Sequence, residues 1–243
     1  MKHFGLIGYP LGHSFSKKYF TEKFKELGLG DHKYELYELK SIDLFPDLLR
    51  DPHLVGINVT VPYKEAVKQF MDTLDQSAEK VGAVNVIRRH GEKLTGYNSD
   101  YFGFRTSLEN FLPKNSVKRA LILGTGGSSK AVRAVLEDLG IQVVFISRKA
   151  GEGVISYDQL TSERISENQL IINTTPLGMH PNVDICPDIP YEALGPTHFL
   201  FDLVYNPTTT AFMQRGSDQG ARVKNGLEML HLQADKSWEI WNS

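Results

Sequence analysis

The sequence of 243 residues contains almost no cysteine and no long apolar run. Its single cysteine, Cys186, excludes an intrachain disulfide framework, and because no His or Cys stands in the surrounding DICPDIP we interpret it as an incidental thiol. No apolar stretch approaches the roughly 18 residues that a membrane-spanning helix needs. The apolar stretch near Met1 is too short for a secretory signal. We therefore expect a cytoplasmic protein that has no membrane partner.

Excess charge of either sign is also missing. The chain has 27 Lys and Arg against 29 Asp and Glu, a net charge of -2, so it lacks the basic field that attracts nucleic acid or anionic lipid. Its eight His are scattered, and no His/Cys/Asp cluster has ligand spacing, so we expect no metal ion. For His13, beside Ser14, a structural role and a ligand role are equally open. The expected partner is a small molecule, and the chain is expected to be a monomer or a homodimer.

What the sequence does contain is an alternation of short apolar runs with helical patterns. Such alternation predicts an α/β fold with parallel sheets. A hairpin is expected to turn at His90–Gly91, and a break near 100–115 separates two α/β lobes. The last 18 residues form an amphipathic helix that is expected to return to the first lobe. Strands are predicted at 3–8, 33–39, 55–61, 117–124, 141–147, 170–175 and 198–205.

The segment LILGTGGSSKAVRAVL carries three glycines between a strand and a helix. Gly124, Gly126 and Gly127 stand where a dinucleotide-binding turn needs them, because glycine lets the backbone approach a pyrophosphate at a helix N-terminus. Ser129 replaces the third glycine of the general pattern. The alternative is an ordinary strand–helix turn whose glycines serve packing.

The end of the following strand indicates which dinucleotide is bound. NAD enzymes carry an acidic residue there to bind the ribose 2′-hydroxyl, whereas this chain has Arg148 and Lys149. Two cations favour a 2′-phosphate and therefore NADP. The alternative is a pair of solvated surface charges.

The stretch NVTVPYK places a lysine where a cation is disfavoured. Pro62 is expected to begin a helix that runs to about Met71, so Lys64 would lie in its first turn, beside the positive end of the helix dipole. Asp100 is expected to be the N-cap of a later helix. A ketone reduction by hydride needs a proton at the carbonyl oxygen, which a lysine beside a carboxylate can deliver. The alternatives are a surface lysine and a plain helix cap.

Polar residues also follow other strands. Ser14, Ser16, Thr60 and Asn85 would supply hydrogen-bond donors and acceptors to a hydroxyl-rich small molecule. The alternative is that they are turn and cap residues, and Ser16 in particular is expected to cap the first helix.

Together these stretches closely resemble the NADP-dependent shikimate dehydrogenase family of aromatic amino-acid biosynthesis. The resemblance covers nearly the whole chain. The matching blocks are GYPLGHSFS, NVTVPYK, GAVNVI, GYNSD, GTGGSS, NTTPLGM, DLVYNPTTT and NGLEMLHLQ, in the order of the family.

The resemblance implies reversible, NADPH-dependent reduction of 3-dehydroshikimate to shikimate. It implies a substrate-binding domain at 1–101 plus 225–243 and a Rossmann-like NADP-binding domain at 102–224. Lys64 and Asp100 would be catalytic, while the family's N-R-T cofactor motif reads Ser147, Arg148 and Lys149 here. A quinate/shikimate dehydrogenase of broader cofactor use and a non-catalytic NADP-binding module are the alternatives.

The resemblance also assigns the residues of both sites. Those expected at the substrate are Ser14, Ser16, Thr60, Lys64, Asn85, Asp100, Tyr205 and Gln233. Those expected at the cofactor are Gly124, Thr125, Gly126, Gly127, Ser128, Ser147, Arg148, Lys149, Leu203 and Gly226.

Overall fold

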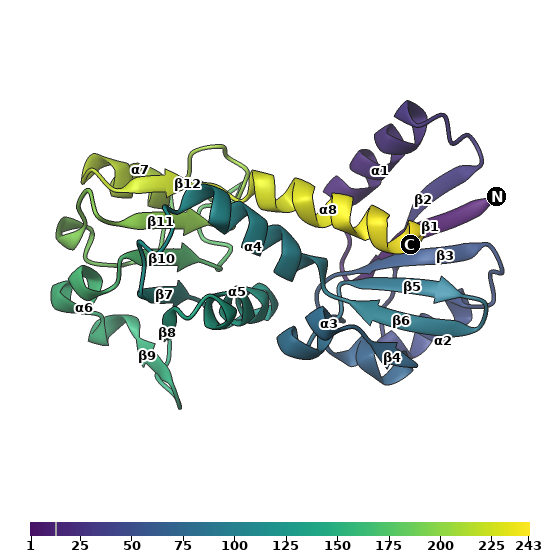
Figure 1. Cartoon of the computed structure of the whole chain (residues 1–243), viewed down its shortest axis with the longest axis horizontal. Helices are drawn as coiled ribbons and strands as arrows, with labels where there is room; N and C mark the ends of the chain where they lie inside the picture. Colours follow the sequence, from purple (N-terminus) through teal and green to yellow (C-terminus); the bar gives the residue numbers. More distant parts are fainter. Residues whose placement is uncertain (13) are drawn as a thin grey trace. The chain divides into compact units, whose positions relative to one another are not determined.

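The computed structural model describes residues 1–12 and 14–243, and the chain forms two compact units (Figure 1). The first unit comprises Met1–Phe102 and Gln233–Ser243, and the second comprises Gly103–Leu232. The two interpretations of His13 lie outside the described residues.

The first unit contains a six-stranded sheet in the order β2-β1-β3-β5-β6-β4. Strands β1, β2 and β3 are parallel, as predicted, whereas β5 pairs antiparallel with both β3 and β6, so the sheet of this unit is mixed. The reason is the predicted hairpin, which is confirmed: His90 pairs with Lys93 across a two-residue turn whose Gly91 has a φ of 62°. The strands are β1 (Lys2–Gly8), β2 (His32–Glu38), β3 (Leu54–Val59), β4 (Thr73–Leu74), β5 (Val86–His90) and β6 (Lys93–Tyr97).

Helices cover both faces of this first sheet. One face packs on α1 and on the C-terminal part of α8, through residues that include Phe20 and Trp241, and this confirms the return of the last helix. Nε1 of Trp241 donates to the backbone oxygen of Ile87 at 3.1 Å, and the indole lies over Gly56, where an added Cβ would come within 2.7 Å of it. The helices are α1 (Phe15–Glu26), η1 (Ile42–Leu44), α2 (Phe45–Leu48), η2 (Ala66–Phe70), α3 (Gln76–Val81) and α8 (Leu227–Asn242).

The second unit contains a parallel sheet in the order β12-β11-β10-β7-β8-β9 (Figure 1). This is the doubly wound strand order, in which the order of the strands reverses between β7 and β10. In folds of this kind a ligand binds at the carboxyl ends of those strands. The strands are β7 (Arg119–Leu123), β8 (Gln142–Ser147), β9 (Val154–Ser156), β10 (Leu170–Asn173), β11 (Phe199–Asp202) and β12 (Arg222–Lys224).

Apolar side chains alternate between the two faces of this second sheet. Phe201 packs against Phe104 of α4, with ring centroids 5.2 Å apart. Its neighbour Leu200 points to the opposite face, where it packs with Ile165 of α6 and Phe212 of α7. The helices are α4 (Ser99–Phe111), α5 (Gly127–Asp138), η3 (Tyr157–Gln159), α6 (Ser162–Glu167), η4 (Tyr191–Ala193) and α7 (Ala211–Asp218).

Candidate active site

Lys64 and Asp100 form an ion pair in the first unit. Nζ of Lys64 lies 2.6 Å from Oδ2 of Asp100. The two side chains retain 16% and 14% of their exposure, so the pair is largely shielded and still reachable. A charge-assisted hydrogen bond of this kind orients both groups, and the ammonium has further protons to donate to a ligand.

Lys64 lies in a turn between β3 and η2, so the prediction that Pro62 begins a helix with Lys64 in its first turn is wrong. Two long-range hydrogen bonds fix this turn. The hydroxyl of Tyr63 donates to the backbone oxygen of Leu39 at 2.6 Å, and the backbone oxygen of Lys64 accepts from the N–H of Val84 at 2.7 Å. The lysine is therefore held by neighbouring loops, and it lies before η2 and not in a first helical turn.

Asp100 lies inside the first turn of α4, and the prediction that it caps this helix is wrong. The cap is the buried Asn98, whose Oδ1 accepts from the N–H of Tyr101 at 3.0 Å and whose Nδ2 donates to the backbone oxygen of Ala83 at 2.9 Å. Because Asn98 satisfies the helix end, the carboxylate of Asp100 is available to Lys64. The helix N-terminus also favours a negative charge at this place.

A buried polar network joins Asn85 to the last helix. The N–H of Ser99 donates to Oδ1 of Asn85 at 2.7 Å, and the hydroxyl of Ser99 lies 3.4 Å from Oε1 of Gln233 and 3.2 Å from Oγ of Ser237. Ser237 in turn donates to the backbone oxygen of Gln233 at 2.8 Å and accepts from Nδ2 of Asn58 at 3.1 Å. The network thus brings two predicted substrate residues, Asn85 and Gln233, to one place.

Sequence reasoning missed three members of this network. Asn58 and Ser99 lie inside NVTVPYK and GYNSD, and this is the only signal that could have identified them. Ser237 follows Gln233 by one helical turn and carries no motif of its own.

The serines of the first predicted motif stand at the beginning of α1. Ser14 is the N-cap residue, so the prediction that Ser16 caps this helix is wrong, and the hydroxyl of Ser14 makes no capping bond. Burial raises the pKa of Tyr34, and the Ser16 hydroxyl acts in the opposite direction. The hydroxyl of Tyr34 donates to Oδ1 of Asn58 at 2.8 Å, so Tyr34 belongs to the same polar network. Thr60 follows β3 directly.

The glycine turn of the second unit follows β7 and begins α5. Gly124 has a φ of 103°, which favours glycine, and an added Cβ there would lie 2.9 Å from Cγ2 of Thr175. Added Cβ atoms at Gly126 and Gly127 would meet nothing within 4 Å. Gly126 is the N-cap and has no side chain to cover the first N–H groups of the helix. This open cradle at a helix N-terminus fits a pyrophosphate.

The other residues predicted at the cofactor lie around this turn. Thr125 follows Gly124, and Ser128 lies in the first turn of α5. Ser147 ends β8, the strand next to β7, and Arg148 and Lys149 after it are exposed. The two cations therefore stand at the carboxyl edge of the sheet, where a ribose phosphate would approach.

Leu203 and Gly226 contact each other at the same edge. The N–H of Gly226 donates to the backbone oxygen of Val204 at 3.2 Å, and an added Cβ on Gly226 would lie 2.2 Å from the backbone oxygen of Leu203. No side chain fits there. Tyr205, two residues after Leu203, is 38% exposed and has its pKa raised by burial.

A fully buried carboxylate, Asp202, lies beside this contact and was not identified from the sequence. It accepts hydrogen bonds from Thr210 at 2.5 Å, from Asn173 at 2.9 Å and from the N–H of Val204 at 3.0 Å. Burial raises its pKa to about 6, although these three bonds act in the opposite direction. The only sequence signal was the block DLVYNPTTT.

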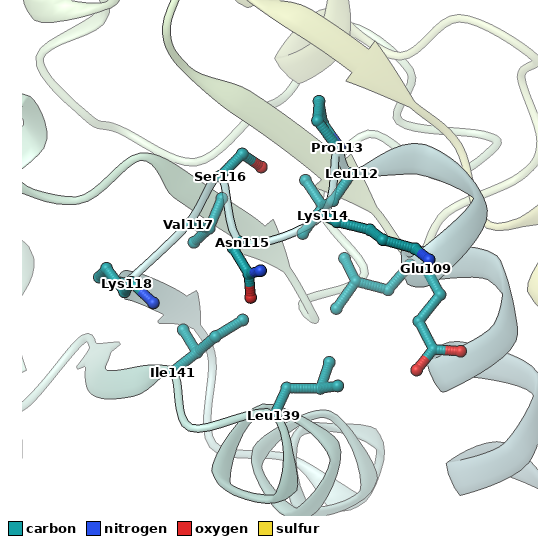
Figure 2. Close-up of a pocket in the computed structure, with 11 residues that line it drawn as sticks. Glu109, Leu112, Pro113, Lys114, Asn115, Ser116, Val117, Lys118, Leu139 and Ile141 are labelled. Atoms are coloured by element: carbon teal, nitrogen blue, oxygen red, sulfur yellow. The ribbon is translucent and has the colours of Figure 1, made fainter.

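A pocket of about 450 Å³ lies at the other edge of the same sheet. Figure 2 shows Leu139 and Ile141 across this pocket from Asn115 and Val117. Because Lys118 precedes β7 and Ile141 precedes β8, the pocket is at the amino ends of these strands. It is therefore separate from the glycine turn.

Within the described ranges 1–12 and 14–243, no group of three or more His, Cys, Asp or Glu could hold a metal ion. Among the same residues, no helix is both long enough and apolar enough to cross a membrane.

The comparisons with known proteins point to one family. Residues 6–87 match the family model described as the shikimate dehydrogenase substrate binding domain. A curated relative from Clostridium beijerinckii, named shikimate dehydrogenase (NADP(+)), is 39% identical over 252 residues, which cover 99% of this chain and 92% of the relative.

Two solved structures are similar to both units. The shikimate 5-dehydrogenase of Thermus thermophilus, solved in complex with NADP(H) and shikimate, has a TM-score of 0.85 at 28% identity and covers 99% of this chain and 93% of its own. The shikimate 5-dehydrogenase of Listeria monocytogenes, in complex with shikimate and NAD, has a TM-score of 0.87 at 29% identity, with coverages of 99% and 91%.

Proposed function

Because this chain belongs to the shikimate dehydrogenase family, we propose that it catalyses the reversible, NADPH-dependent reduction of 3-dehydroshikimate to shikimate in aromatic amino-acid (chorismate) biosynthesis. Its two α/β units correspond to an N-terminal substrate-binding domain and a Rossmann-like NADP-binding domain. The observation that carries the proposal is the 2.6 Å pair of Lys64 and Asp100, in a chain that matches the family over nearly its full length.

The proton in this reaction is assigned to the paired lysine. When hydride adds to the carbonyl carbon of 3-dehydroshikimate, the carbonyl oxygen becomes a hydroxyl and must gain one proton. The ammonium of Lys64 donates that proton to the oxygen, and Asp100 orients the ammonium and stabilises its charge. In the reverse direction the neutral amine accepts the proton from the hydroxyl.

Substrate binding is assigned to the polar groups of the first unit. The hydroxyls of Ser14 and Ser16 at the N-terminus of α1 suit the substrate carboxylate, because a helix N-terminus favours an anion. Asn85 and Gln233, joined through Ser99, suit the ring hydroxyls. Thr60 completes this group, and Tyr205 of the second unit is assigned to the substrate as well.

Cofactor binding is assigned to the carboxyl edge of the second sheet. NADPH supplies the hydride when it is bound. The glycine turn from Gly124 to Gly127 holds the pyrophosphate, and Ser128 lies in the same cradle. Arg148 pairs with the 2′-phosphate, with Ser147 and Lys149 beside it. The backbone of Leu203 and the close contact at Gly226 support the nicotinamide.

The remaining assignments are organisational. We propose domain limits of 1–101 plus 225–243 for the substrate-binding domain and 102–224 for the NADP-binding domain. We also propose a cytoplasmic location, in line with a biosynthetic role that needs no disulfide. The active form is a monomer or a homodimer.

One alternative has a specific observation in its favour. The Listeria relative was solved with NAD, so a quinate/shikimate dehydrogenase of broader cofactor use is the second candidate. Steady-state kinetics with shikimate and quinate, each with NADP and NAD, distinguish the two. A preference for quinate, or equal use of both cofactors, would favour the alternative.

The main proposal is tested by measuring the shikimate-dependent reduction of NADP through the change in absorbance. Lys64→Ala is expected to lower kcat by at least about 100-fold, the usual contribution of general acid–base catalysis, with a smaller change in KM. Lys68→Ala, four residues further on in η2, is the matched control and should leave kcat unchanged. NADPH binding without turnover of either acid would instead indicate a non-catalytic module.

A further inference from the structure

The blocks NTTPLGM and DLVYNPTTT each begin with a buried polar residue at the carboxyl edge of the second sheet. Asn173 ends β10 and Asp202 ends β11, and the two residues are paired in the register of these parallel strands. Nδ2 of Asn173 donates to Oδ1 of Asp202 at 2.9 Å, and both residues are fully buried. The two blocks are therefore connected at the strand ends.

Asp202 holds the loop that runs from Leu203 to the beginning of α7. Oδ1 of Asp202 also accepts from the N–H of Val204 at 3.0 Å, and Oδ2 accepts from the hydroxyl of Thr210 at 2.5 Å. Thr210 is the N-cap of α7, and its Oγ1 accepts from the N–H of Met213 at 3.3 Å. One carboxylate thus fixes both ends of the segment 203–210.

Asn173 extends the same network to the glycine turn. Its Oδ1 accepts from the N–H of Thr175 at 3.0 Å and from the hydroxyl of Thr175 at 2.6 Å. Thr174 donates through Oγ1 to the backbone oxygen of Leu123 at 2.8 Å. Both threonines pack against Gly124, because an added Cβ there would lie 2.9 Å from Thr175 and 3.0 Å from Thr174.

The chemistry of the central group explains why it is an aspartate. Its three partners are neutral donors, and burying a carboxylate among neutral groups is costly. A carboxylate accepts from all three at once and has no hydrogen to satisfy, whereas an asparagine would turn an N–H₂ toward Thr210. A side chain needed for packing alone would not require this charge.

We propose that Asp202 is a positioning residue for the cofactor. With Asn173 and Thr210 it holds the backbone of Leu203 at a fixed position relative to the glycine turn at Gly124. This inference rests on the proposed function, because it takes those two segments to be the nicotinamide and pyrophosphate contacts. Asp202 is fully buried, so it acts through the loops that it holds.

The test is direct binding of NADPH, measured by calorimetric or fluorescence titration, to the full chain and its variants. Asp202→Asn is expected to weaken NADPH binding about tenfold, the effect of about one lost hydrogen bond. Wherever turnover is measurable, KM for NADP should rise by a similar factor, and kcat at saturating cofactor should stay within about threefold. A dissociation constant within about twofold of the unchanged chain overturns the proposal.

Two further variants separate positioning from folding. Thr210→Val removes the hydroxyl at nearly constant volume and should weaken NADPH binding, whereas Thr210→Ser keeps the hydroxyl and should restore it. Asn168→Ala removes the hydrogen bond that Nδ2 of the buried Asn168 donates to the backbone oxygen of Arg164 at 2.7 Å, at the amino edge of the same sheet. This variant should lower stability without changing NADPH affinity. If Asn168→Ala weakens NADPH binding as much as Asp202→Asn does, a general loss of stability is the cause and the proposal fails.

The same titration keeps the two proposals apart. Weaker NADPH binding by Asp202→Asn, in a chain that turns over no shikimate, supports the positioning role and refutes the proposed function. Normal NADPH binding by Asp202→Asn, in an active enzyme, refutes the positioning role alone. A chain that binds no NADPH refutes both.

Discussion

The buried carboxylate of Asp202 should make the stability of the second unit fall as pH rises. Burial raises its pKa from 3.8 to about 6, so in a pH window from about 4 to 6 the folded chain keeps a proton that the unfolded chain has lost. Stability declines with pH wherever the folded state binds more protons. Asp202 therefore contributes most to the free energy of unfolding below about pH 4, and this contribution is lost as the pH rises through about 6.

The size of this loss follows from the same two values. They differ by about two pH units, and each unit corresponds to about 1.4 kcal/mol, so ionisation of Asp202 should cost the folded state about 3 kcal/mol. Asp202→Asn has no ionisation and lacks this dependence. The difference in unfolding free energy, unchanged chain minus variant, should accordingly fall by about 3 kcal/mol between pH 4 and pH 7.

The assay must report on the second unit alone. The two tryptophans, Trp238 and Trp241, both belong to the first unit, so intrinsic fluorescence is a reference for that unit. Pulsed hydrogen exchange with mass spectrometry, at increasing urea concentrations, follows peptides from β10 and β11 instead. Other titrating groups are common to both chains and cancel in the difference. The reasoning is refuted if the difference in unfolding free energy, unchanged chain minus Asp202→Asn, stays constant from pH 4 to pH 8 or rises with pH.

Two further predictions concern the cofactor. Arg148→Ala should raise KM for NADP more than KM for NAD, because only NADP carries the 2′-phosphate; equal increases in steady-state assays would refute that role. Gly226→Ala should raise KM for NADP and lower the unfolding free energy by about 1–3 kcal/mol, since its Cβ would lie 2.2 Å from the backbone oxygen of Leu203. Gly195→Ala is the control, because an added Cβ there meets nothing within 4 Å, and urea titrations in which the two variants behave alike would contradict the steric argument.

The features that the sequence predicted well are those specified by neighbouring residues. The hairpin at Gly91 and the turn at Gly124 depend on backbone conformations that glycine permits, and both are present. The long apolar strands are present as well. Strands as short as β4 and β12, with two and three residues, carry too little pattern to be predicted.

The errors occur where distant contacts overrule a local preference. Proline is favoured at the start of a helix, but after Pro62 the chain forms a turn that Leu39 and Val84 hold by hydrogen bonds. Asn98 and Asp100 are both good helix caps, and the amide of Asn98 takes that role while Asp100 pairs with Lys64.

The buried networks were beyond prediction for the same reason. Asn58 and Ser237 are hydrogen-bonded across 179 positions of the chain, and Asn173 and Asp202 across 29. In a single sequence such residues can be recognised only as members of a motif. Their hydrogen-bond partners are decided by the tertiary fold, when the strands assemble into sheets.

The return of α8 to the first sheet has a consequence for synthesis on the ribosome. Phe4 and Phe20 leave the ribosome early, yet Trp241, which packs against them, follows only after the whole of 103–232. The nascent first unit must therefore wait with the part of one apolar face that α8 covers still exposed, while the second unit already has all of its strands. The Rossmann-like unit is thus able to fold first, and the unit that begins the chain is completed after it.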